Sequence, residues 1–182
     1  MLTPEVPMSH SLAGEPPAAG RRAAPLTTAV YSAVEWDLLT GLPGRVVVVA
    51  TAPAPGRPLR GVAAGLAGLE AVAAGRAFDS DLVRAVVATI YARHDEPAPP
   101  ARTGQGRRRG RSAPTDPADL LADCRTAARV LRRRADPADS AAYRQWVQTV
   151  AARVCRAVPS GPTLSPADQH FLDRLGAALG LR

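Results

Sequence analysis

The residues that could carry chemistry in this chain are few and scattered. Its two cysteines, Cys124 and Cys155, form no Cys-x-x-Cys pair of the kind that binds zinc or performs redox chemistry. Both lie on expected apolar helix faces, which favours two small buried side chains over a disulfide or a reactive thiol. His170 and Asp173 are one helical turn apart, but two possible ligands on an exposed helix do not make a metal site.

No group of residues in the sequence has the spacing of a known catalytic site. There is no Ser/His/Asp or Cys/His arrangement of recognisable form, and no glycine-rich phosphate loop. We therefore expect a protein that is not an enzyme, with no catalytic residues, no cofactor-binding residues and no metal ligands.

An Arg-rich segment gives the clearest hint of a partner. Within the sequence GQGRRRGR, a flexible run of basic side chains could neutralise the phosphates of a nucleic acid or lie on another anionic surface; its members are Arg107, Arg108, Arg109 and Arg111. The segment has no aromatic residue for base stacking, so such binding would be independent of sequence and sensitive to salt.

The basic charge also has a simpler explanation. The net charge is +7, and all 23 basic residues are Arg, as expected of a protein from a GC-rich genome. The Arg-rich segment could then be a solvated linker, and both readings remain open. No apolar run is long enough to span a bilayer, and no signal peptide is recognisable, so we expect a cytoplasmic protein.

Three similar caps organise the second half of the chain. A Pro-Ala-Asp sequence follows Asp116, Asp136 and Ser165. In each case Asp or Ser is a good N-cap, Pro suits the first helical position, and the last Asp faces the positive end of the helix. These caps predict helices at about 117–135, 137–158 and 166–179.

The helix expected at 137–158 is the most distinctly amphipathic part of the chain. Its large apolar residues recur on one side of a 3.6-residue period: Tyr143, Trp146, Val147, Val150, Val154 and Val158. Such a face needs partners, so the other helices are expected to pack around this one.

The first half of the chain predicts shorter elements. Ser32 and Glu35 form a capping box that opens a helix, which Gly41 and Pro43 are expected to end. Residues 45–52 contain four consecutive Val and could form a strand, but no other segment could pair with it, so a buried helix is favoured.

Two further helices are expected before the Arg-rich segment. One spans 59–75, and its core face is expected to consist of Val62, Leu66, Leu69, Val72 and Ala73. Its glycines would let a neighbouring helix approach closely. The other spans 81 to about 93 and begins after Asp79 and Ser80.

Together these elements predict an all-α fold, a single bundle of six or seven helices. We expect a disordered tail at 1–27, a helical half at 28–94, a disordered Arg/Pro/Gly-rich insert at 95–115 and a second helical half at 116–182. The two halves would form one domain.

The end of the chain resembles TerB-like proteins, the tellurite-resistance family of small helical bacterial proteins. The resemblance rests mainly on residues 136–181, which contain the Ser160-Gly161 turn, the Ser165 to Asp168 cap, a Leu-rich helix and a closing Leu179-Gly180. Ser160 stands where the family has an acidic residue, and Asp168 stands where it has Glu. The resemblance therefore does not carry over the metal binding that those acidic residues suggest.

The resemblance implies a function in protein contacts. TerB-like proteins look like interaction or stress-response modules, so we expect an unidentified protein partner. Nucleic-acid or anionic-surface binding through the Arg-rich insert is the alternative. The sequence does not indicate an oligomeric state.

Overall fold

The computed structural model describes residues 30–95, 116–157 and 164–181. Within these ranges the chain forms helices and no strand, which confirms the all-α prediction. The helices are α2 (Ala33–Thr51), α3 (Val62–Ala74), the short 3₁₀ turn η1 (Gly75–Ala77), α4 (Asp81–Asp95), α5 (Pro117–Arg134), α6 (Pro137–Arg156) and α7 (Pro166–Leu179). The predicted disorder at 1–27 and at 95–115 falls outside the described residues, except that Asp95 ends α4.

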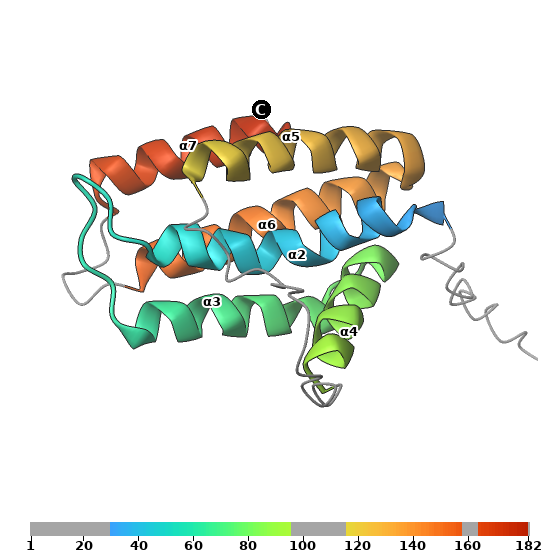
Figure 1. Ribbon diagram of the computed structural model, residues 1–182, viewed down its shortest axis with the longest axis horizontal. Helices are drawn as coiled ribbons and strands as arrows, with labels where there is room; N and C mark the ends of the chain where they lie inside the picture. Colours follow the sequence, from blue (N-terminus) through green and yellow to red (C-terminus); the bar gives the residue numbers. More distant parts are fainter. Residues whose placement is uncertain (1–29, 96–115, 158–163, 182) are drawn as a thin grey trace, which may run out of the picture.

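The helices are arranged in three tiers (Figure 1). α5 and α7 lie side by side in one tier, α2 and α6 form the middle, and α3 and α4 lie on the opposite side. α6 packs against all five of the other α-helices. The bundle is therefore built around α6, as its amphipathic pattern predicts.

The buried face of α6 is the one that the sequence indicates. Tyr143, Trp146, Val147, Val150 and Val154 are each at most 1% exposed. The Tyr143 and Trp146 rings meet edge to face, with centroids 5.8 Å apart. Val158, the last residue of the predicted face, lies outside the described residues.

The prediction that Gly41 and Pro43 end the first helix is wrong. α2 continues through Pro43 to Thr51. A proline inside a helix leaves the carbonyl four residues earlier without its usual amide donor. That carbonyl belongs to Leu39, and the buried Tyr143 hydroxyl donates a 2.7 Å hydrogen bond to it. The helix continues because a side chain from α6 replaces the missing backbone bond.

The four-valine segment is the second half of α2, so the helical interpretation of residues 45–52 is confirmed. Val46, Val47 and Val49 are buried, whereas Val48 is 51% exposed. This is the pattern of a helix with one side against the core, and it overrides the β propensity of valine. α2 is one helix of 19 residues and not the two shorter helices that the sequence suggested.

The predicted core face of α3 is also wrong. Val62, Leu66 and Leu69 are 81%, 53% and 58% exposed, and Ala73 is only partly buried. Of the predicted set, only Val72 is buried. The opposite, small-residue side faces the core, and its buried members are Ala64, Gly68, Ala71 and Val72.

Close packing explains this reversal. A Cβ at Gly68 would lie 2.7 Å from a methyl carbon of Val154 and 2.8 Å from one of Val47. α3 therefore sits deep in the groove between α2 and α6, where only a side without large side chains fits. Gly75, just after the helix, is similarly enclosed by Val87 and Trp146.

The predicted caps are confirmed. The side chains of Asp116 and Asp136 accept hydrogen bonds from the amides of Ala118 and Ala138. Ser32 and Glu35 form both bonds of the capping box. Ser165 caps α7, and Gly180 ends it with φ 70°, a left-handed conformation that glycine adopts without strain.

We expect Tyr143→Phe to lower the free energy of unfolding by about 1–3 kcal/mol, because the Leu39 carbonyl would be left buried without a partner. In a Pro43→Ala background the new amide can bond to that carbonyl, so the same change should cost less. Urea titration of the four proteins in this cycle measures the difference. An equal loss in both backgrounds would show that Tyr143 does not compensate for Pro43.

Candidate functional site

The three Pro-Ala-Asp caps end in aspartates with different environments. Asp119 of α5 is exposed. Asp139 of α6 accepts a 2.7 Å hydrogen bond from the hydroxyl of Ser80, which also caps α4. Asp168 of α7 is fully buried. The cap sequence alone does not distinguish these three aspartates.

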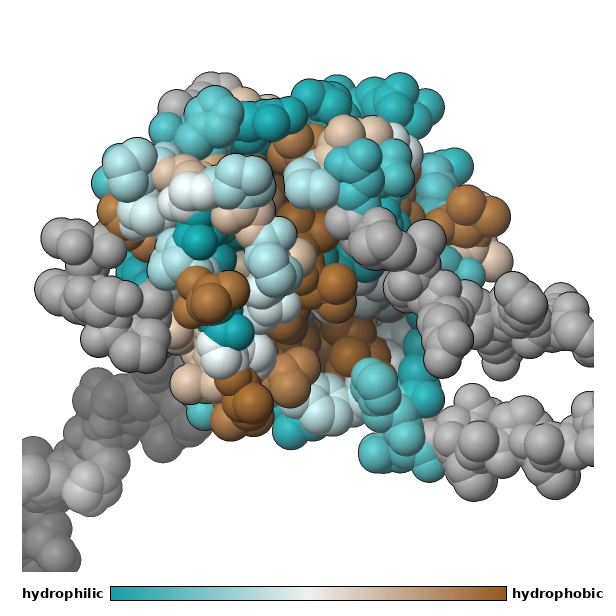
Figure 2. All heavy atoms as spheres, turned by 60° about the vertical axis from the view of Figure 1, so that its left-hand side comes forward, coloured by the Kyte–Doolittle hydropathy of each residue, from teal (hydrophilic) through white to brown (hydrophobic). Residues whose placement is uncertain are grey.

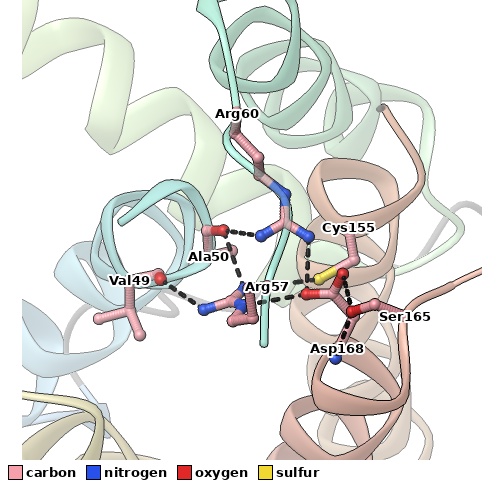
Figure 3. Close-up of polar contacts among 7 residues, drawn as sticks. All are labelled: Val49, Ala50, Arg57, Arg60, Cys155, Ser165 and Asp168. Atoms are coloured by element: carbon pink, nitrogen blue, oxygen red, sulfur yellow. Dashed lines mark hydrogen bonds and ion pairs between the residues drawn. The ribbon is translucent and has the colours of Figure 1, made fainter. Parts of the chain in front are cut away.

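Asp168 is the centre of a buried cluster of charges (Figure 3). Its Oδ1 accepts a 2.9 Å hydrogen bond from Nε of Arg57 and a 2.7 Å bond from a terminal nitrogen of Arg60. Its Oδ2 accepts a 2.8 Å bond from the Ser165 hydroxyl. The side chains of Arg57, Arg60 and Asp168 are 6%, 1% and 1% exposed.

The same two arginines reach the end of α2. Arg57 donates to the carbonyls of Val49 and Ala50 at 3.1 and 2.9 Å, and Arg60 donates to Ala50 at 2.6 Å. These carbonyls belong to the last turn of α2, where the helix dipole is negative. Two guanidinium groups are thus balanced by one carboxylate and by the α2 C-terminus. The guanidinium of Arg57 also lies 4.7 Å from the centroid of the Phe171 ring.

This arrangement fixes the charge state of Asp168. Burial alone would raise the pKa of the carboxyl group, but hydrogen bonds from Arg60, Arg57 and Ser165 outweigh it and hold the pKa below its usual range. Both carboxylate oxygens are already engaged by the chain's own donors. Asp168 therefore joins α2 to α7, an arrangement suited to fixing their positions.

Sequence reasoning missed this cluster because it placed Arg60 in a helix at 59–75, whereas α3 begins only at Val62. Arg57 and Arg60 both lie in the segment between α2 and α3. The available signal was weak: two arginines three residues apart in a Pro- and Gly-containing stretch. Their burial depends on Asp168, more than 100 positions later. The cluster anchors the connection that leads into α3.

The two cysteines are free and buried. Burial raises the pKa of Cys124 to about 12. It also raises the pKa of Cys155, whose sulfur lies 3.9 Å from a terminal nitrogen of Arg57. Raised pKa values keep both groups as thiols, which agrees with the interpretation of both residues as small core side chains.

The outer side of α3 is an exposed apolar surface. We call Val62, Leu66 and Leu69 the α3 face; Leu59, 84% exposed, precedes it. α3 has a single charged residue, Glu70. Figure 2 shows hydrophobic side chains gathered in the lower half of the molecule, the half that contains α3 in Figure 1. Helices that are apolar on both sides are normally covered on both sides.

A pocket of about 270 Å³ adjoins α3. It lies between α3 and α6, and its lining combines small and aromatic residues with a charged rim: Ala67, Glu70, Ala71, Ala74, Phe78, Trp146, Thr149 and Arg153. Its place beside the α3 face makes room for an apolar side chain from a bound partner.

The remaining sequence candidates lie elsewhere. Arg107, Arg108, Arg109 and Arg111 are outside the described residues. His170 is exposed on α7, the helix that also carries Asp173. Among the described residues, no three His, Cys, Asp or Glu side chains are grouped closely enough to hold a metal ion.

Comparison of the chain with family models, with curated proteins and with solved structures found no match. In the described part of the chain, every helix is too short or too polar to cross a membrane. The resemblance to TerB-like proteins is thus neither supported nor contradicted by these comparisons.

We expect Asp168→Asn to lower the free energy of unfolding by about 3–5 kcal/mol, because it leaves two buried arginines without their counter-charge. Asp119→Asn is the matched control. It changes the last Asp of the same Pro-Ala-Asp sequence, here on the surface and after an Asp N-cap, and should cost about 0.3–1 kcal/mol. Similar losses in the two variants, measured by urea titration, would contradict the structural role of the cluster.

The same pair of variants has a pH signature. The pKa of Asp168 is lower in the folded protein than in the unfolded chain, so its stabilising effect is present above the unfolded value of about 4. It is lost as the pH falls through the lower, folded value. The difference in stability between wild type and Asp168→Asn should therefore shrink below about pH 4.

Proposed function

We propose that this chain is a non-enzymatic helical interaction module, and that its α3 face binds an amphipathic helix of a partner protein. The observation that carries the proposal is the exposure of Val62, Leu66 and Leu69 on a helix with one charged residue. Clustered aliphatic side chains on an otherwise polar surface mark binding sites far more often than isolated ones do.

The spacing of the α3 face suits a helical partner. Its residues are four and three positions apart, which places them in a straight line along the helix axis. A second helix lying along this line could bury all three side chains, each worth about 1.5–3 kcal/mol when fully removed from water. The adjoining pocket could receive one larger apolar anchor.

α3 is also held firmly enough to present such a face. Its N-terminus follows the segment anchored by Arg57 and Arg60, and its middle is wedged against α2 and α6 at Gly68. Near its end, the indole N–H of Trp146 donates a 3.1 Å hydrogen bond to the Ala71 carbonyl. A rigid surface loses little conformational entropy on binding.

The resemblance to TerB-like proteins supports the same class of function. It implies an interaction or stress-response module, and not an enzyme with a known reaction. We do not extend the family's suggested metal binding to this chain. Asp168, which occupies the relevant cap, is engaged with Arg57, Arg60 and Ser165.

A photo-crosslinking amino acid at Val62 tests the proposal in cells that naturally make the protein. We expect discrete protein adducts from this position, identified by mass spectrometry. Val34 is the matched control, because it is the same residue type and is 79% exposed, against 81% for Val62, but lies at the start of α2. Equal adducts at both positions, or none at Val62, would contradict a binding role for the α3 face.

The alternative function is binding to nucleic acid or another anionic surface. It rests on Arg107, Arg108, Arg109 and Arg111, and one structural observation favours it. A hollow of about 380 Å³ between α5 and α7 is lined by three exposed arginines and by small residues: Arg125, Arg129, Arg132, Ala128, Ala177, Ala178 and Gly180. Arginines along one helix side can contact successive phosphates.

Retention on DNA at low salt tests this alternative. If the alternative holds, changing the four arginines of the insert to Ser should abolish retention. Changing Arg125, Arg129 and Arg132 of α5 to Ser should weaken retention. Retention itself should fall steeply as the salt concentration rises, because phosphate contacts release counterions. Unchanged retention in both variants, or no retention by the wild type, would exclude the alternative and leave the α3 proposal untouched.

A further inference from the structure

We infer that the helix that covers the α3 face is α3 of a second copy of this chain, in antiparallel orientation. The inference rests on the proposed function, because it takes the α3 face as a protein-binding surface and names its partner. It is carried by the way charge and apolar side chains are distributed along α3.

The apolar part of α3 is suited to pairing with itself. Leu66 lies at the middle of the face, with Val62 on one side and Leu69 on the other. A two-fold axis through Leu66 would bring these aliphatic residues of both copies into one seam. Gly65 borders the seam, and a Cβ there would meet no atom within 4 Å, so a second helix has room to come close.

The charge on α3 then selects the orientation. The first turn of α3 has no acidic residue, and its N-cap, Gly61, makes no side-chain hydrogen bond. This end of the helix is therefore positive and has no capping side chain. The single charge, Glu70, lies at the edge of the face in the second half of the helix.

Antiparallel pairing brings these two features together. Glu70 is four residues after Leu66, and Val62 is four residues before it, so each lies about 6 Å from Leu66 along the axis. With the axis at Leu66, Glu70 of one copy is level with the first turn of α3 in the other. Symmetry makes this contact twice. A parallel pair would instead keep Glu70 level with the second half of the other α3, about 12 Å along the axis from its positive N-terminus.

The size of the face predicts a weak, reversible dimer. An apolar patch of this kind covers about 300–600 Å² on each copy. Two such patches give an interface near or below about 1,200 Å², the lower limit for stable complexes. We therefore expect dissociation in the micromolar range, so that the monomer and the dimer both occur.

Sedimentation of the purified full chain over a range of concentrations tests the inference. We expect the average mass to rise from 18.9 kDa towards twice that value as the concentration increases. Leu66→Glu should remain monomeric, and Val34→Glu should dimerise like the wild type. Circular dichroism and urea titration show whether each variant is folded. Because Leu66 and Val34 are both exposed, we expect both variants to fold.

Glu70→Gln tests the orientation. In the antiparallel dimer this variant loses two contacts between a carboxylate and a helix N-terminus, so the dissociation constant should rise about three- to thirty-fold. In a parallel dimer Glu70 would lie away from the N-terminus of the other α3, so the same change should leave the dissociation constant nearly unchanged. An unchanged or lower dissociation constant for Glu70→Gln would therefore overturn the antiparallel assignment.

Disulfide trapping provides a second measurement. Both native cysteines are buried, so Leu66→Cys would carry a single exposed thiol. Close to the two-fold axis, this thiol should form a disulfide-linked dimer under mild oxidation. Val34→Cys, the matched control, should not, because it lies away from α3.

The possible outcomes separate this inference from the proposed function. A monomer at every concentration, or a dimer that survives Leu66→Glu, overturns the self-pairing. Adducts of a different protein at Val62 in cells, together with a monomeric purified chain, would keep the interaction module and replace its partner. If a chain without residues 1–29 dimerises and the full chain does not, the N-terminal segment is the occupant, and self-pairing in the full chain is again overturned.

Discussion

The structure depends on the burial of one carboxylate. Asp168 is removed from water near the start of α7, and a buried charge is tolerated only with complete local compensation. Arg57 and Arg60 supply it, and each of them also donates to a carbonyl that α2 leaves unpaired at its last turn. One cluster thus forms hydrogen bonds at the C-terminus of α2 and at the first turn of α7, and it holds the segment between α2 and α3 in place. This contact holds the chain where α3 begins, and the close packing at Gly68 decides which side of α3 faces outward.

The aromatic residues of α6 fill the core and also donate hydrogen bonds to the backbones of neighbouring helices. Large side chains are scarce in this chain, with two Trp, three Tyr and two Phe. Two of them, Tyr143 and Trp146, bond to the buried carbonyls of Leu39 and Ala71. The first of these carbonyls is released by Pro43, and the second lies where α3 tightens into η1. α6 therefore supports its neighbours by hydrogen bonds to their backbones as well as by apolar packing, and this lets α2 pass through a proline.

Local signals in the sequence predicted local structure well. The three Pro-Ala-Asp caps, the capping box at Ser32 and the apolar face of α6 depend on residues within a few positions of one another, and the structure confirms them. The errors arose where a distant residue decides. Pro43 is expected to end a helix unless another element donates a hydrogen bond to the Leu39 carbonyl. Nothing in the sequence near Pro43 indicates that Tyr143 is the donor. Periodicity placed the large residues of α3 inside, whereas the close approach of Val47 and Val154 admits only glycine. The Arg57–Arg60–Asp168 cluster was missed for the same reason.

The reversed orientation of α3 bears directly on function. The fold needs the small side of this helix and makes little use of the large one, so stability does not explain Val62, Leu66 and Leu69 on the surface. Alanine, glutamate or arginine would suit those positions at least as well, because each has good helix propensity and carries less cost in water than an exposed aliphatic side chain. Valine at position 62 is a poor helix former as well as 81% exposed. Residues that are unfavourable for both the helix and its solubility, and that lie in one line, are best explained by a contact made outside the monomer.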